Sequence, residues 1–268
     1  MINNNKKIIF NHVYQRHQRS NLIVCLLFIL FANLSFSQKR ESDNEQLLTV
    51  GFQLRPVIAG RFFGAGEFES TDRIFTSKIK PSLGYTFGML IRRGITKKIS
   101  IETGINYIRR NYSLTWNDDS LNRNEKSRFG MVSYEIPIQC LVYVRLGERL
   151  YMNNSLGLSI NFLASDVATF SEVYPITQRA YLNRVVANPS VLANVGFEYR
   201  SKKVGFFYLG ASLHRPFTRI ATSVVKYDLG SKKYENQIAL TGSFLTIDFR
   251  YFFHSQPIKK RVHREKKK

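Results

Sequence analysis

The chain has 268 residues, a formal net charge of +21 and only two cysteines. Its length suits one sizeable domain after an N-terminal leader. Cys25 lies in that leader, and the remaining Cys140 cannot form an internal disulfide, which excludes a disulfide scaffold and a cysteine metal cluster. The mean hydropathy of -0.21 does not exclude a membrane location, because only every second residue of a membrane-spanning strand meets lipid.

The first 37 residues have the composition of a cleaved signal peptide. Leu22 to Phe31 form an apolar run, and Ser35 and Ser37 are small residues before a cleavage point, which places the mature start at Gln38. The basic region before the run holds Lys6, Lys7, Arg16 and Arg19. An uncleaved signal anchor is the alternative, but the run is well short of the about 20 apolar residues that a spanning helix needs. A Gln at position 38, in place of Cys, does not indicate lipid anchoring.

After a polar lead-in at residues 38–46, eight segments alternate apolar with polar or small residues. A period of two is the pattern of a strand whose two faces meet different surroundings. In the clearest segment, Ile99, Ile101 and Ile105 share one face, and Ser100 and Glu102 share the other. The segments cover residues 48–55, 83–91, 99–107, 132–144, 150–162, 191–199, 204–214 and 245–253.

The connections between these segments alternate in length. Short links occur around residues 94–97, 147–148 and 201–203, whereas the other four gaps run to roughly 15 to 25 residues. A membrane barrel segregates its connections in this way, with tight turns on one side and long loops on the other. We therefore expect an all-β fold at residues 47–253, an eight-stranded antiparallel transmembrane up-and-down β-barrel preceded by a cleaved signal peptide. It would lie in the outer membrane of a Gram-negative cell, with both termini in the periplasm.

The polar face of each segment supports this expectation. Gly, Ser, Asn, Thr and Glu occupy sites that would form the core of a soluble sandwich. In hydrocarbon every backbone group must be paired within the protein, and a closed sheet achieves this without an edge. A slip of one residue would turn Glu102 and Glu135 toward lipid, at a cost on the order of a few kcal/mol near the middle of the membrane.

Charged residues on the inward face predict an ion-pair network in the lumen. Counted from the periplasmic strand ends, seven of them lie in the same half of the barrel, namely Arg92, Glu102, Arg145, Glu198, Arg200, Asp248 and Arg250. Arg110 and Glu135 form a further predicted pair near the outer end. Because an eight-stranded barrel is just wide enough for its side chains to fill it, we expect a salt-bridged plug. The alternative is a narrow transport pore lined by these charges.

The aromatic residues at the strand ends predict interfacial girdles. One girdle would include Tyr107, Tyr112 and Trp116, and the other Tyr199, Tyr251 and Phe253. A nucleic-acid interface would instead need a contiguous basic patch with stacking aromatics on a soluble face, so we expect no nucleic-acid partner.

One further alternative is a lipid-modifying outer-membrane enzyme. His214 lies at the height of the outer rim, and Ser212 shares its face two residues away. A nucleophile and base need hydrogen-bond geometry and a partner acid, which the sequence does not identify. We therefore expect a histidine with an ordinary hydrogen bond, no catalytic residues, no cofactor and no metal.

Two strand segments and the end of the leader resemble one family. Tyr134–Ile138 (YEIPI), Ile101–Tyr107 (IETGINY) and Ser35–Gln38 (SFSQ) are similar to the outer-membrane β-barrels of Bacteroidota, the PorT-like group. The resemblance covers roughly Leu47 to Phe253. It implies a small barrel, associated in the case of PorT with the type IX secretion system, and it implies no functional residues.

The chain departs from this family pattern after Phe253, where barrels of this type often end. Residues 254–268 form a basic tail, and positions 259–268 hold seven bases and one acid. Such a segment cannot bury apolar surface, so we expect a solvated tail. Its natural targets are a periplasmic or secretion-machinery protein, or anionic membrane lipid. The sequence thus predicts a non-enzymatic barrel with a structural or scaffolding role, in contact with outer-membrane lipid.

Overall fold

The structure of the chain is a computed structural model. It describes residues 48–58, 66–118, 122–164, 166–171, 174, 176–182, 187–201, 204–230 and 232–253. The predicted signal peptide, the predicted lead-in and the basic tail lie outside the described residues. Among the described residues, no helix is long and apolar enough to cross a membrane.

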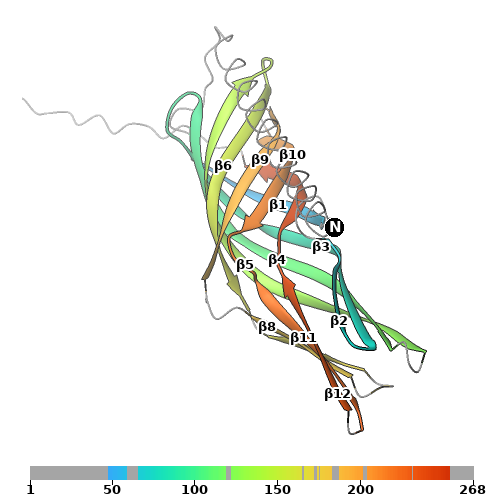
Figure 1. The fold of residues 1–268 in the computed structure, drawn as a ribbon. Coiled ribbons are helices and arrows are strands. Elements are labelled where there is room, and N and C mark those ends of the chain that lie inside the picture. Colours follow the sequence, from blue (N-terminus) through green and yellow to red (C-terminus); the bar gives the residue numbers. More distant parts are fainter. Residues whose placement is uncertain are drawn as a thin grey trace, which may run out of the picture. The chain divides into compact units, whose positions relative to one another are not determined.

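The described residues form thirteen β-strands (Figure 1). Their bounds are β1 Leu48–Ile58, β2 Phe68–Asp72, β3 Phe75–Gly94, β4 Ile99–Asp118, β5 Arg123–Arg145, β6 Leu150–Leu163, β7 Val167–Phe170, β8 Ile176–Leu182, β9 Ala187–Arg200, β10 Phe206–Pro216, β11 Ala221–Leu229, β12 Lys232–Leu240 and β13 Phe244–Phe252.

Eight of these strands close into a ring. Their order is β1, β3, β4, β5, β6, β9, β10 and β13, and antiparallel pairing of β13 with β1 completes the circle. Every neighbouring pair is antiparallel. The ring consists of the eight segments expected from the alternation, so the predicted eight-stranded antiparallel barrel is confirmed. Closure leaves the ring without a free edge, which satisfies the backbone groups of all eight strands.

The outer face of this ring is apolar. Outward side chains such as Phe52, Phe87, Ile138 and Phe249 are about half exposed, while their polar neighbours along each strand point inward and are buried. Each strand contributes to a continuous band, which we call the apolar belt. Representative members are Phe52, Leu54, Phe87, Met89, Ile101, Ile105, Ile136, Ile138, Leu156, Leu158, Val195, Phe197, Phe207, Leu209, Ile247 and Phe249.

The short connections lie at one end of the ring, as predicted. The β3–β4 turn closes with Ile95 N donating to Ile99 O (2.9 Å), and the β5–β6 turn closes with Leu146 N donating to Leu150 O (2.9 Å). The start of β1 and the end of β13 lie at the same end of the ring, where Phe253 N donates to Val50 O (2.9 Å). We call this end the turn end.

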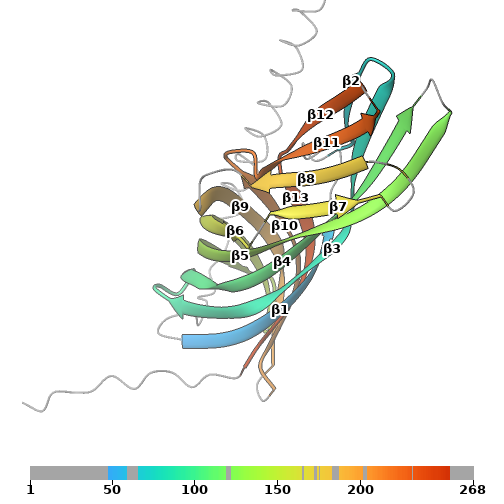
Figure 2. The same ribbon diagram turned by 90° about the horizontal axis from the view of Figure 1, so that it is seen from below.

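At the opposite end the prediction of long loops is wrong. Strands β3 and β4 have 20 residues each and β5 has 23, so they continue well past the ring. β2 pairs with β3, while β12, β11, β8 and β7 form a separate four-stranded sheet (Figure 2). We call these five strands, with the far ends of β3, β4 and β5, the extension.

Side-chain hydrogen bonds join the small sheet to the long strands. On one edge, Asn236 of β12 donates from Nδ2 to Phe75 O and to Ser77 Oγ, both at 3.0 Å. On the other edge, Ser171, which follows β7, donates from Oγ to Glu125 Oε2 of β5 (2.6 Å). The extension therefore encloses an interior of its own between two curved layers.

That interior is apolar, unlike the interior of the ring. Trp116 and Tyr227 are buried together, with ring centroids 6.1 Å apart. The Tyr227 hydroxyl donates to Asp118 Oδ2 (3.0 Å), and burial together with this bond raises the pKa of Tyr227. The core consists of Phe75, Ile79, Tyr112, Leu114, Trp116, Phe129, Met131, Ile176, Ala180, Ile220, Ala221, Val225, Tyr227, Tyr234, Ile238 and Leu240.

Two girdle assignments are therefore wrong. Tyr112 and Trp116 point into the core of the extension, where they are 4% and 1% exposed. Tyr107 does lie on the outer face, with its ring 4.8 Å from that of Phe87. The error arises because the face that points inward is polar in the ring and apolar in the extension.

We predict that Trp116→Ala loosens the extension without opening the ring. Removing a buried Trp side chain costs about 3–5 kcal/mol, and the cavity lies wholly within the extension core. Limited proteolysis of the folded protein in detergent should cut the β11–β12 region at least several times faster, while the ring keeps its heat-resistant mobility on a gel. Thr115→Ala, an exposed neighbour on the same strand, is the matched control. Equal cleavage of both variants would contradict this core assignment.

Candidate functional site

The ring interior holds a continuous chain of alternating arginine and carboxylate side chains. Its six members follow the order Arg200, Glu198, Arg92, Glu102, Arg250 and Asp248. Arg92 Nη2 lies 2.7 Å from Glu102 Oε2, and Arg250 Nη1 lies 2.7 Å from Glu102 Oε1. Glu102 is thus held between two guanidinium groups, one on each carboxylate oxygen. Three positive and three negative charges make the chain formally neutral.

This chain crosses the lumen instead of following one wall. Arg92 lies on β3 and Glu198 on β9, which face each other across the ring, and the two side chains form an ion pair. Glu102 on β4 meets Arg250 on β13, also a non-neighbouring strand. Glu102, Glu198 and Asp248 have no exposed surface. The ion pairs therefore span the lumen between strands that are not neighbours.

Aromatic rings fill the space on the turn-end side of the ion pairs. The Arg92 guanidinium lies 3.8 Å from the centroid of Phe252, and that of Arg200 lies 4.2 Å from the centroid of Tyr151. A guanidinium over an aromatic face gains cation–π attraction while its edge donates to carboxylates. Each arginine is thus fixed both by its face and by its edge.

A second polar cluster lies nearer the extension. Glu135 on β5 accepts from Asn106 Nδ2 (3.0 Å) and Ser159 Oγ (2.9 Å), and it lies 3.6 Å from Arg55 Nη2 on β1. His214 Nδ1 lies 3.1 Å from Glu135 Oε1, and its Nε2 lies 3.3 Å from Arg55 Nη1. Because arginine can only donate, Nε2 must accept, so Nδ1 carries the proton and donates to Glu135.

The predicted pairing of Arg110 with Glu135 is therefore wrong. Arg110 Nη1 donates to Ser133 Oγ (2.7 Å), and its guanidinium lies 4.8 Å from the ring centroid of Phe244. Arg55, which shares the inward face of its strand, takes the place beside Glu135 instead. The predicted pair follows from residue counts along each strand, which ignore strand tilt. The tilt of the strands brings Arg55 and Glu135 to the same depth in the barrel.

Arg145 lies at the turn end, where its guanidinium is 5.9 Å from the ring centroid of Tyr151. Its Nε donates to Gly147 O (2.8 Å) in the β5–β6 turn. This turn contact holds Arg145 at the end of β5, whereas the sequence predicts it among the lumen charges. Conversely, Arg55 and His214 belong to the interior and were absent from the predicted network, although both occupy inward positions of the period-two pattern.

The arrangement around Ser212 and His214 bears on the enzyme alternative. Ser212 Oγ donates to Asp248 Oδ2 and accepts from Asn194 Nδ2 (2.8 Å), so its proton is directed to a carboxylate. His214 faces Glu135 and Arg55, as described above. Within the described ranges, no group of three or more His, Cys, Asp or Glu side chains is placed to hold a metal ion.

No protein-family model matches the chain. No curated protein matches it either. Several solved structures are similar in fold, and those reported are outer-membrane proteins. One is the outer membrane protein OprG from Pseudomonas aeruginosa, with a TM-score of 0.46 at 11% identity over 80% of this chain and 98% of that one. Another is the outer membrane protease OmpT from Escherichia coli, with a TM-score of 0.34 at 8% identity over 78% and 95% of the two chains.

A third similar structure is the COG4313 outer membrane channel from Pseudomonas putida F1, with a TM-score of 0.26 at 9% identity over 81% of this chain and 99% of that one. At such low identity the likeness concerns the β-barrel fold alone. The strand order and pairing of the described residues themselves define an all-β protein built on a closed, eight-stranded antiparallel barrel.

We predict that Glu102→Gln strongly destabilises the barrel. The substitution keeps the size of the side chain but leaves Arg92 and Arg250 facing each other without the charge between them. Breaking a buried pair from one side costs about 3–5 kcal/mol. The free energy of unfolding, measured by urea titration in detergent micelles, should fall by that amount.

Gln139→Ala is the matched control for this measurement. Gln139 lies beside Glu102 in the β4–β5 register and accepts from Ser155 Oγ (2.7 Å), without an ion pair. Its loss should cost about 1 kcal/mol. If Glu102→Gln were no more destabilising than this control, the ion-pair chain would not stabilise the barrel.

Proposed function

We propose that this protein is a non-enzymatic outer-membrane β-barrel with a closed lumen, which holds the extension outside the cell as a structural scaffold. The observation that carries the proposal is the contrast between an exposed apolar belt and a buried, charge-neutral interior in one closed ring.

The belt supports the membrane location. Monomeric soluble proteins rarely expose contiguous apolar patches larger than a few hundred square ångströms, and here such residues encircle the ring on all eight strands. Apolar outward and polar inward positions with a period of two are the pattern of a transmembrane barrel. The position of both ring termini beside the short turns supports a periplasmic turn end and an extracellular extension.

The interior supports a closed lumen. An eight-stranded barrel leaves room for little more than its own side chains. In this chain that room holds ion pairs across the ring, and the guanidinium groups rest on aromatic rings, as described above. Such an interior is suited to a rigid anchor and unsuited to passage of a solute.

The scaffolding role is supported by the extension, which has its own apolar core beyond the ring. The resemblance to the PorT-like group adds protein secretion as the most specific version of this role. In that version, the basic tail at 254–268 would bind a periplasmic or secretion-machinery partner. Purification of the tagged protein from its native outer membrane should recover secretion components, whereas recovery of the barrel alone would argue against this version.

We predict that the protein carries no steady current in planar lipid bilayers. Its ion pairs block the lumen, so insertion should give no conductance steps. The double variant Arg92→Ser with Glu198→Ser removes one neutral pair from the full width of the lumen and is the matched control. It should show small steps under the same conditions. Regular single-channel steps from the unchanged protein would favour the transport pore.

Cysteine labelling provides a direct test of topology. Cys140 lies on the outer face of β5, within the belt. A membrane-impermeant maleimide should not label Cys140 in native membranes but should label it after denaturation. In a Cys140→Ser background, Lys232→Cys in the extension should react on intact cells, and Glu148→Cys in the β5–β6 turn only after permeabilisation. Labelling of native Cys140, or a reversed pattern for the two introduced cysteines, would contradict the proposal.

A further inference from the structure

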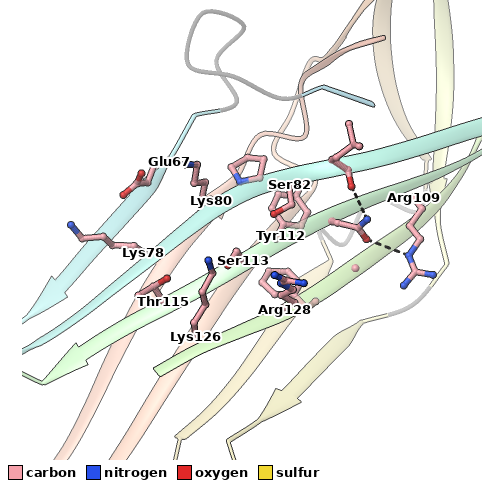
Figure 3. A pocket seen from close by; sticks show the side chains of 15 residues that line it. Glu67, Lys78, Lys80, Ser82, Arg109, Tyr112, Ser113, Thr115, Lys126 and Arg128 are labelled. Carbon is pink, nitrogen blue, oxygen red and sulfur yellow. Dashed lines mark hydrogen bonds between the residues drawn. The ribbon is translucent and has the colours of Figure 1, made fainter. Parts of the chain in front are cut away.

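A hollow on the outer face of β3, β4 and β5 lies directly beyond the apolar belt, with a volume of about 770 Å³ (Figure 3). On the extension side its wall is basic, with the four cations Lys78, Lys80, Lys126 and Arg128, and a fifth cation, Arg109, lines it nearer the ring. On the ring side it reaches Leu83, which is 69% exposed and continuous with the belt. The hollow therefore joins a cationic wall to an apolar one.

The strand register places the cations in two rows. In the first row Lys80, Ser113 and Arg128 lie side by side on β3, β4 and β5. In the next row, two residues further along, Lys78, Thr115 and Lys126 repeat the same order. Each row thus sets a small hydroxyl side chain between two basic ones, which lie about 10 Å apart across two strand spacings.

Small residues form the floor on the membrane side of these rows. Ser82, Asn111 and Gly130 make up the preceding row, and Asn111 Nδ2 donates to Leu83 O (2.8 Å). Arg109 Nε donates in turn to Asn111 Oδ1 (3.3 Å). A Cβ at position 130 would lie 3.2 Å from Arg109 Nε and 3.0 Å from Asn111 Oδ1, so glycine leaves room for the guanidinium over β5.

Ser113 points to a ligand independently of the charges. Its side chain lines the hollow and is only 7% exposed, yet its Oγ has no hydrogen-bond partner among the described residues. A buried hydroxyl is normally paired, because an unmet hydrogen bond carries a desolvation cost. A hydroxyl between lysine and arginine side chains is the donor set that phosphate oxygens accept.

Acidic residues reduce the positive charge of the hollow without cancelling it. Lys78 Nζ lies 3.3 Å from Glu69 Oε2, and both side chains are about half exposed. Glu67 also lines the hollow. Such an exposed pair is weak and competes poorly with a multivalent anion. Lys80 and Arg128, which flank Ser113, form no ion pair within the described part of the chain.

We propose that this hollow binds the phosphate-bearing headgroup of an outer-leaflet glycolipid, with the acyl chains along Leu83, Tyr85 and Tyr107. The volume exceeds that of a lone phosphate, and the direct continuity with the belt favours a lipid over a soluble phosphate compound. The inference rests on the proposed membrane location of the belt but not on the scaffolding role or the closed lumen.

The test measures binding in detergent micelles, where the result does not depend on membrane insertion. The probe is lipid A with two phosphates, and the comparison ligands are its dephosphorylated form and inorganic phosphate. Native mass spectrometry of the purified protein should detect bound lipid A. Neither the dephosphorylated lipid nor inorganic phosphate at equal concentration should bind comparably.

The charge variant is Lys80→Gln with Arg128→Gln. Loss of two cations near a membrane surface should weaken lipid A binding by about 30-fold. Lys232→Gln with Lys233→Gln removes the same charge from the exposed β11–β12 region and should change binding by less than about twofold. Ser113→Ala keeps every charge and should weaken binding by about 2- to 10-fold through the lost hydroxyl. Heat-resistant gel mobility confirms that each variant is folded.

Equal losses in the two charge variants would overturn the proposal, because they would indicate a general attraction to basic protein. Equal binding of the dephosphorylated lipid, or displacement of lipid A by inorganic phosphate, would also overturn it. If lipid A does not bind but Cys140 is protected from the maleimide in native membranes, the headgroup site alone is rejected. Labelling of Cys140 in native membranes would reject the membrane location itself.

Discussion

Neutralisation of charge inside a closed ring is the constraint on which this structure depends. Strands with an apolar outer face must turn their other face inward, and in this chain that face carries arginines and carboxylates. An uncompensated charge in so narrow a space would cost several kcal/mol. The chain of six charged residues meets the constraint by giving Glu102 and Glu198 two arginines each. The same interactions tie together strands that are not neighbours, so electrostatics adds to the backbone pairing that closes the ring.

The same long strands serve two different surroundings. On β4, the inward row reads Ser100, Glu102 and Asn106 in the ring and then Leu114 and Trp116 in the extension, while the outward row changes from isoleucine to polar residues in the same interval. Inside and outside exchange polarity along one continuous strand, at the level where β3 has a register shift between Ser82 and Tyr85. The reversal limits contact with hydrocarbon to the ring, because in the extension the outward residues are polar, as on an ordinary water-soluble surface.

This reversal also explains what the sequence could predict. Alternation identified all eight ring strands, because their two faces differ sharply in polarity. The extension alternates as well, but with the opposite assignment, so Tyr112 and Trp116 were placed on the wrong face. Strands β7 and β8 are 4 and 7 residues long, and their pairing depends on contacts with distant strands. No local pattern marks such short elements.

The interior was predictable in kind but less so in detail. The inward charges and their near balance follow from the period of two, and the structure brings six of the nine named residues into one chain. Which arginine meets which carboxylate depends on strand tilt and on the reach of side chains across the ring, as the exchange of Arg110 for Arg55 beside Glu135 illustrates. Neither quantity can be read from spacing along one strand.

The central claim is that hydrocarbon contacts the belt and stops where the polarity reverses. Trp116 is the single tryptophan of the chain and lies in the extension core, so its fluorescence reports on that boundary directly. The measurement is quenching by brominated acyl chains after reconstitution into vesicles, with Phe249→Trp in a Trp116→Phe background as the belt reporter. The account predicts strong quenching of the belt reporter and almost none of Trp116. Strong quenching of Trp116, or none at position 249, would contradict it.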